Sequence, residues 1–150
     1  DLPYDGREEL GSVDGTIAKE VSGMVNGRRN PNILYVHNDR NNDPMLMAID
    51  KSNGRMVGNW ALGGISHIDY EDISNGPGPK PDLNYLHLCD IGDNPKDRRT
   101  VWIHRLPEPA LTGGLGAKIF YPQTPTMKHN LYVGIVMYLK NAKMMKDITQ

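Results

Sequence analysis

Short apolar segments alternate with clusters of turn-forming residues along most of the chain. In the first half the apolar segments cover residues 21–25, 33–36, 45–50 and 55–62. The breaks between them are rich in Asn, Asp, Gly and Pro, and the last one contains Asn53-Gly54, a pair typical of β-hairpin turns. Segments of this length between such breaks predict four short antiparallel strands.

The same series of segments recurs in the second half. Residues 70–73 match residues 21–24 at an offset of 49, and residues 85–90 match residues 34–39 at an offset of 51, which aligns Asp90 with Asp39. Residues 100–106 then match the segment that begins at Met45. A repeat of about 50 residues with four short strands is typical of a propeller blade. A β-sandwich also has many short strands, but it gives no reason for an acidic residue to recur at the end of the same strand.

The sequence therefore predicts an all-β fold, an incomplete β-propeller with two recognisable four-stranded blades and a divergent C-terminal tail. We expect an irregular lead-in over residues 1–19, blades over residues 20–122 and the tail over residues 123–150. Two consecutive four-stranded sheets are expected between Val21 and Tyr121. Apolar strand residues in both repeats are expected to be buried, namely Leu34, Val36, Leu46, Ile49, Leu86, Leu88, Val101 and Ile103.

Composition agrees with this architecture and narrows the partners. The chain has 38% hydrophobic residues, 16 Gly and 11 Pro, which suits short strands and frequent turns. Its 17 basic and 18 acidic side chains give a net charge of −1, so no basic surface is available for nucleic acid. No apolar run reaches the roughly 20 residues that a membrane-spanning helix needs. The single cysteine, Cys89, cannot form an internal disulfide, and one thiol with five scattered histidines does not compose a zinc site.

Several segments together resemble a family of largely uncharacterised secreted β-propeller proteins. The resemblance covers Glu20 to Pro122 and is carried by Tyr35 to Asp39, Ala48 to Asp50, Asp69 to Ile73, Gly76 to Pro79, Asp90 to Asn94 and Arg105 to Pro109. It implies an extracellular propeller of about six blades, distantly related to phytase-like and gluconolactonase-like propellers, and it implies no activity. Residues 131–150 depart from the family pattern, and three explanations are open: a partial sequence, an alternative exon or a reading-frame error. Their apolar spacing is compatible with a helix or a strand.

Acidic side chains occur near the ends of the predicted inner strands, namely Asp39, Asp69, Glu71, Asp72, Asp90 and Asp93. In a propeller the innermost strands line a central channel, so acids at equivalent blade positions converge at one mouth. Converging carboxylates repel unless a cation or a proton lies among them. Oxygen ligands without thiolate or paired imidazole select a hard cation, calcium first and magnesium second. We therefore expect Asp39, Glu71 and Asp90 to share a metal ion.

The other interpretation is that these side chains cap turns. Asp and Asn at strand ends often accept hydrogen bonds from nearby backbone N–H groups. That is the expected role of Asn38, Asp50, Asp93 and Asn94.

No catalytic residue is predicted. His37 and His87 lie on predicted strands near the acidic positions, but a solvated or hydrogen-bonded strand histidine is the simpler interpretation. No Gly-x-Ser-x-Gly motif marks a serine nucleophile. Cys89 lies in an apolar segment and is expected to be a small buried side chain, and Trp60 and Trp102 are expected in the core.

Two functions remain open at this point. The first is an extracellular binding propeller, stabilised by calcium and without a reaction, whose loops contact an unknown protein or small-molecule ligand. The second is a calcium-dependent phosphoesterase or lactonase-type hydrolase, with Glu71 as base and Arg98-Arg99 holding the substrate. Two blades cannot close a ring, so the isolated chain is expected to associate or fold loosely unless residues 131–150 cover its open faces.

Overall fold

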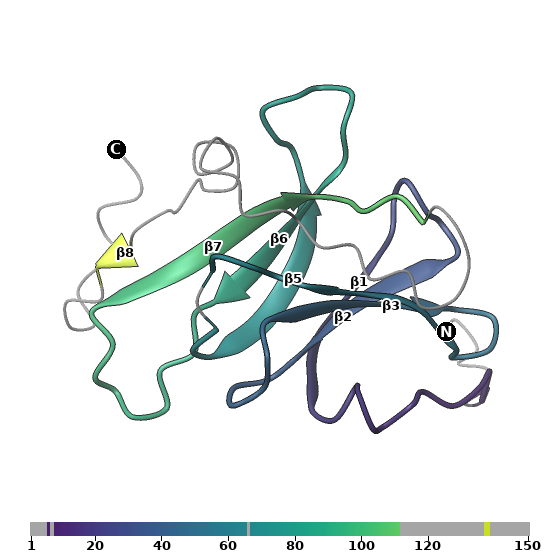
Figure 1. The fold of residues 1–150 in the computed structure, drawn as a ribbon, viewed down its shortest axis with the longest axis horizontal. Helices are drawn as coiled ribbons and strands as arrows, with labels where there is room; N and C mark the ends of the chain where they lie inside the picture. Colours follow the sequence, from purple (N-terminus) through teal and green to yellow (C-terminus); the bar gives the residue numbers. More distant parts are fainter. Residues whose placement is uncertain (1–5, 7, 66, 112–136, 139–150) are drawn as a thin grey trace.

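The computed structural model describes Gly6 and residues 8–65, 67–111 and 137–138 (Figure 1). These residues form an all-β structure without helices, and none of them lies in a helix long and apolar enough to cross a membrane. The strands are β1 (Val21–Asn26), β2 (Ile33–Asn38), β3 (Met45–Asp50), β4 (Met56–Ala61), β5 (Tyr70–Gly76), β6 (Tyr85–Asp90), β7 (Thr100–Pro107) and β8 (Met137–Tyr138). The predicted all-β class is confirmed.

The strands form two antiparallel sheets that follow chain order. Sheet 1 has the order β1-β2-β3-β4, and sheet 2 has the order β5-β6-β7. The two-residue β8 pairs with Thr100 and Val101 at the start of β7. This strand comes from the segment predicted as a divergent tail, whereas residues 112–122, where the fourth strand was expected, lie outside the described part of the chain.

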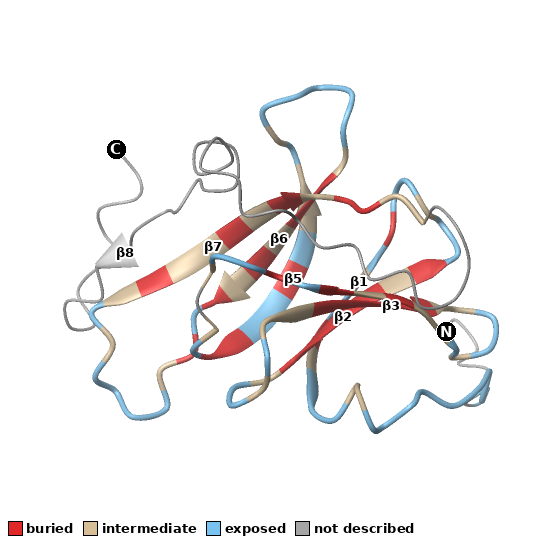
Figure 2. Ribbon diagram, in the orientation of Figure 1, coloured by how far each residue is buried: buried red, intermediate tan, exposed pale blue. Residues whose placement is uncertain are grey.

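The main core lies between the two sheets. Sheet 1 contributes Tyr35, Leu46 and Trp60 to it, and sheet 2 contributes Leu86 and Leu88; these five side chains are at most 2% exposed. Each large apolar side chain removed from water in this way stabilises the fold by about 1.5–3 kcal/mol. Figure 2 shows the buried positions running along β2, β3 and β6. Burial between the sheets therefore holds the two repeats together.

A second cluster covers the opposite face of sheet 1. Val36, Met47 and Ile49 are buried there beneath Ile17 and Ala18 of the lead-in segment. These two residues of the lead-in are therefore a structural part of the fold.

Most of the predicted buried residues are buried. Val36, Leu46, Ile49, Leu86, Leu88 and Val101 are at most 4% exposed, whereas Leu34 and Ile103 are half-buried. The predicted hairpin turn at Asn53-Gly54 is also confirmed, because it joins β3 to β4. Gly54 adopts a φ of 75° there, and its N–H donates to the carbonyl oxygen of Asp50 over 2.9 Å.

The strand pairing follows the same pattern in both halves of the chain but corrects the predicted alignment. Both first strands carry a β-bulge at the same place, between Val21 and Gly23 in β1 and between Tyr70 and Asp72 in β5. Val21 pairs with Asn38, whereas Tyr70 pairs with Asp90. Asn38 is therefore the counterpart of Asp90, and the alignment of Asp39 with Asp90 was wrong by one residue.

No acid takes the place of Asp39 in the second repeat, where Asp90 is followed by Ile91, which is 38% exposed, and by Gly92, whose N–H donates to the carbonyl oxygen of Asp69 as the N–H of Asp39 donates to that of Glu20. A one-residue shift in a strand moves a side chain to the opposite face of the sheet. The one-residue error in the alignment therefore changes which acidic side chains are expected to lie close together.

The two sheets contact each other through β5, which lies against β1 and β2. Polar links join the two first strands near both of their ends. The Ser22 hydroxyl donates to the carbonyl oxygen of Tyr70 over 2.7 Å, and the Asn75 amide donates to the carbonyl oxygen of Asn26 over 2.7 Å. The first of these links lies next to the acidic residues at the start of β5.

Candidate functional site

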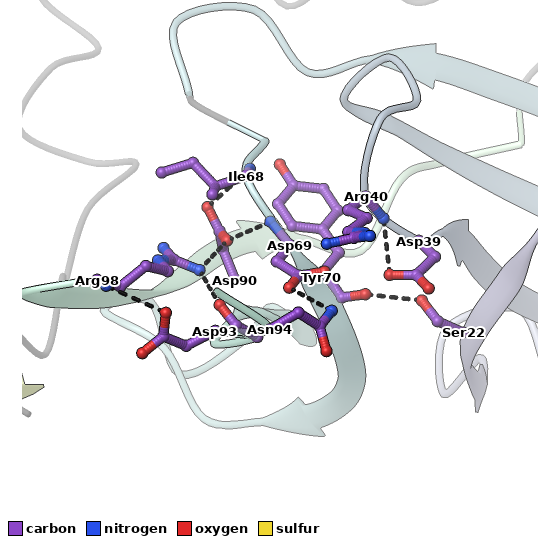
Figure 3. A network of polar contacts seen from close by, with 11 residues as sticks. Ser22, Asp39, Arg40, Ile68, Asp69, Tyr70, Asp90, Asp93, Asn94 and Arg98 are labelled. Atoms are coloured by element: carbon purple, nitrogen blue, oxygen red, sulfur yellow. Dashed lines mark hydrogen bonds and ion pairs between the residues drawn. The ribbon is translucent and has the colours of Figure 1, made fainter. Parts of the chain in front are cut away.

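Three carboxylates meet where the two sheets join. Asp39, Asp69 and Glu71 each place a carboxylate oxygen within 4.8 Å of such an oxygen on the other two. Asp39 directly follows β2 of sheet 1, whereas Asp69 and Glu71 flank Tyr70 at the start of β5 in sheet 2. Figure 3 shows Asp39 beside Ser22 and Asp69 on the side of Asn94 and Arg98. The cluster therefore draws its ligand atoms from both sheets.

Local backbone geometry holds the two acids of sheet 2 in place. Glu71 is the extra residue of the β5 bulge, and the N–H of Gly92 donates to the carbonyl oxygen of Asp69 over 3.1 Å. A Cβ atom on residue 92 would overlap Asp69 Cγ and Glu71 Oε1. Glycine is thus the residue that leaves room for both carboxylates.

Asp69 is the most buried member of the cluster, at 3% exposed. Its Oδ2 accepts a hydrogen bond of 3.1 Å from the Asn94 amide, but its Oδ1 is buried and has no hydrogen-bond partner among the described residues. A buried carboxylate oxygen without a partner is costly unless a cation or a proton compensates it. The Asp69 carboxylate is therefore the member of the cluster that most needs a compensating group.

The other two carboxylates are more accessible to solvent. Asp39 is half-buried and accepts a hydrogen bond of 2.7 Å from the backbone N–H of Arg40. Glu71 is exposed. Partial loss of hydration, together with the negative charges of Asp69 and Asp39, raises the pKa of Glu71 above its ordinary value. The pKa shift thus reflects the partial burial of Glu71 first and its two acidic neighbours second.

Asp90 lies behind this cluster in a different environment. It is completely buried and forms an ion pair of 2.8 Å with Arg98, which also donates to the carbonyl oxygen of Gly92. The carboxylate further accepts the backbone N–H groups of Asp69 over 2.9 Å and Ile68 over 3.3 Å. Asp90 thus positions the backbone next to the cluster and is neutralised by Arg98.

Of the three ligands expected from the sequence, the structure brings Asp39 and Glu71 together and places Asp69 with them instead of Asp90. The physical reason is the one-residue error in the repeat alignment. Asp69 was among the acids noted in the sequence, and its place immediately before the strand that contains Glu71 is the signal that could have selected it.

Two of the four predicted turn caps are confirmed. Asp50 accepts a hydrogen bond of 2.8 Å from the backbone N–H of Ser52, and Asp93 accepts one of 3.0 Å from the backbone N–H of Asp97. Asn38 and Asn94 act differently. The Asn38 side chain accepts a hydrogen bond of 3.3 Å from the backbone N–H of Glu20 in the lead-in. The Asn94 amide donates a hydrogen bond to the Asp69 carboxylate.

Three histidines surround Tyr70, an arrangement that the sequence did not predict. Their ring centroids lie 5.7 Å (His37), 3.9 Å (His67) and 6.1 Å (His104) from that of Tyr70. Burial lowers the pKa of His37 and of His104, so both rings favour the neutral form.

His37 is not arranged as a base for Ser22. Its Nδ1 lies 3.2 Å from the carbonyl oxygen of Asn38, which can only accept a hydrogen bond, so Nδ1 carries the proton. The Ser22 hydroxyl lies 3.2 Å from the same nitrogen and donates its own proton to the carbonyl oxygen of Tyr70. Ser22 therefore accepts from His37, which is the opposite of what nucleophile activation requires.

The remaining reactive side chains are held in structural environments. Cys89 is a half-buried free thiol whose pKa is raised by burial and by the charge of Asp72, so it is a weak nucleophile. Trp60 is buried, as predicted, whereas Trp102 is half-buried.

Fold and site together define an all-β protein of two antiparallel sheets with a carboxylate cluster at their junction. Comparison of the chain with protein-family models, with curated proteins and with solved structures gave no match.

Proposed function

We propose that this chain is part of an extracellular binding propeller. We propose further that Asp39, Asp69 and Glu71 bind a hard divalent cation, for which calcium is the first candidate. The observation that carries the proposal is the buried Oδ1 of Asp69, which has no hydrogen-bond partner among the described residues and belongs to a group of three carboxylates. A cation bound by the Asp69 carboxylate would compensate its buried charge and the repulsion within the group at the same time.

The ligand set favours calcium over softer metals. Carboxylate oxygens are the ligands of hard cations, and two oxygens bound to one calcium ion at its usual distances can lie up to about 5 Å apart. The three carboxylates supply at most six oxygens, and the exposure of Glu71 leaves room for water to complete the shell. Magnesium fits less well because it requires shorter distances in a near-ideal octahedron.

The propeller part of the proposal is supported by the arrangement of the sheets. Antiparallel pairing in chain order, the bulge in the first strand of each sheet and the contact between β1 and β5 are what consecutive blades with adjacent inner strands would have. The cluster itself is not a by-product of the repeat, because Asp90 is followed by Ile91 and Gly92 where Asn38 is followed by Asp39. An acid that the shared framework of the two sheets does not require is better explained by a specific role.

A hydrolase has less support. Arg98, one of the two candidates for holding an anionic substrate, is only 8% exposed in its side chain and is paired with Asp90. Incubating the chain with phosphoesters and lactones, with calcium and with a chelator, should yield no calcium-dependent turnover. Turnover that is lost in Glu71→Gln would replace the binding function with the hydrolytic one.

Isothermal titration of the whole chain with calcium tests the cation site. We expect one calcium ion to bind per chain, and Asp69→Asn to weaken the affinity at least about tenfold, the equivalent of roughly 1.4 kcal/mol. The matched control is Asp43→Asn, which removes an exposed carboxylate close to Asp39 in the sequence and should leave the affinity unchanged. Absence of binding at millimolar calcium, or equal losses in both variants, would overturn the proposal.

A further inference from the structure

The carboxylate cluster differs from the other polar links between the sheets in the sign of its charges. Asp39 belongs to sheet 1, and Asp69 and Glu71 belong to sheet 2, so charges of the same sign face each other across the junction. Coulomb repulsion between carboxylates this close destabilises any state that brings them together without a counterion. A divalent cation bound among them reverses that interaction into an attraction.

A second cross-sheet contact, in which Glu108 holds the turn between β1 and β2, works without a cation. The Glu108 carboxylate, which directly follows β7, accepts hydrogen bonds from the backbone N–H groups of Arg28 over 3.1 Å and of Arg29 over 2.9 Å. A carboxylate that meets backbone donors is already compensated. The contact made by Glu108 therefore does not depend on a bound cation. The contact at Asp39 does, because a cation is needed there to offset the repulsion between the carboxylates.

We propose that calcium occupancy regulates the packing of the two sheets, because the bound ion joins the end of β2 to the start of β5 and its removal leaves repulsion at the same point. The inference rests on the cation site proposed above and adds that Asp39 makes the site a link between the sheets. A site formed by Asp69 and Glu71 alone would bind calcium within sheet 2 without this effect.

Thermal unfolding of the wild-type chain and of its Asp39→Asn variant, each measured with calcium and with chelator, tests this proposal. We expect the difference in Tm between the two proteins to have opposite signs in the two conditions. In chelator, Asp39→Asn removes repulsion, and we expect its Tm to lie about 2–4 °C above that of the wild type. In millimolar calcium the variant lacks one ligand, and we expect its Tm to lie below that of the wild type by a similar amount, about 2–4 °C. Asp43→Asn, the control, should shift the Tm equally in both conditions.

Hydrogen exchange of the wild type supplies a measurement that does not depend on a variant. Calcium should slow exchange at the start of β5 and at the end of β2, with no change in the hairpin of residues 51–55.

The outcomes separate the two proposals. If wild-type calcium binding is intact but Asp39→Asn retains wild-type affinity and the same Tm response, the link between the sheets is refuted and the cation site remains. If the wild type does not bind calcium, the proposed function fails and the link fails with it. A reversal of the sign of the Asp39→Asn effect between the two conditions supports both.

Discussion

Glu108 provides the sharpest test of how the two sheets are held together. It is 3% exposed and directly follows β7 of sheet 2, yet the hydrogen bonds of its carboxylate all reach the turn between β1 and β2 in sheet 1. Oε2 accepts the N–H groups of Arg28 and Arg29, and Oε1 accepts the N–H of Asn30 over 3.1 Å and its amide over 3.2 Å. Replacing this one carboxylate therefore removes four hydrogen bonds between the sheets.

The size of the effect follows from these contacts. A hydrogen bond to a charged group contributes about 1.5–3 kcal/mol, but the four bonds share one carboxylate whose burial is itself costly, so their sum overstates the loss. We expect Glu108→Ala to lower the free energy of unfolding by about 3–4 kcal/mol, among the larger effects of single substitutions. Glu108→Gln keeps one acceptor but turns an amide towards backbone donors, so the expected loss is about 2 kcal/mol.

Urea unfolding followed by tryptophan fluorescence measures these losses, because Trp60 lies in the core between the sheets. Glu9→Gln is the matched control, since Glu9 is exposed, and it should change the free energy of unfolding by less than about 0.5 kcal/mol. If Glu108→Ala is as stable as this control, the contact does not hold the sheets together and the packing between them suffices.

Three further predictions concern the surroundings of the cluster. Asp90→Asn leaves the buried arginine partner uncompensated and should lower the free energy of unfolding by about 3–5 kcal/mol in urea; a loss below about 1 kcal/mol would show that the pair is not buried. Burial lowers the pKa of His104 below its ordinary 6.5, so the unfolded chain binds the proton more readily and stability should fall as the pH decreases through about 6.5. His104→Gln should flatten this pH dependence in thermal unfolding, and an unchanged profile would contradict the assignment. Gly92→Ala should weaken calcium binding at least about tenfold in titration calorimetry, whereas Gly15→Ala, with open space around its Cβ position, should not.

The strands could be predicted from the sequence because each is a short apolar segment between turn residues. Residues 45–50 and 85–90 were placed with the bounds that the structure shows, and the Asn53-Gly54 turn marked the hairpin between β3 and β4. These signals are local, since each depends on a few neighbouring residues and on the backbone preferences of Asn and Gly.

The composition of the site could not be predicted with the same accuracy. Matching the acids at the ends of two strands aligned Asp39 with Asp90, but the bulged ladders make Asn38 the counterpart of Asp90. The segments before the two strands differ in length, so similarity of residue type was a poor guide to register. One residue of error was enough to put a buried, arginine-paired carboxylate in the place of Asp69.

Contacts between distant residues were beyond the reach of the sequence patterns. Glu108 meets a turn that lies about 80 residues earlier in the chain, and His104 meets Tyr70 only because β5 and β7 belong to one sheet that packs on another. No spacing or motif marks such pairs, because they are set by how the sheets face each other.

The two repeats also suggest where a function would arise in such a fold. Equivalent positions serve the same structural purpose in both: the N–H before the first strand donates to the side chain at the end of the second, from Glu20 to Asn38 in one repeat and from Asp69 to Asp90 in the other. The carboxylate cluster uses the same framework but needs Asp39 as well, whereas in the second repeat Ile91 and Gly92 follow Asp90 and neither is an acid. The shared positions maintain the sheet, so selection for folding alone does not require an acid at residue 39. A third carboxylate facing two others is unfavourable for folding unless a cation or a proton compensates it, and the bound cation that we propose would supply this compensation.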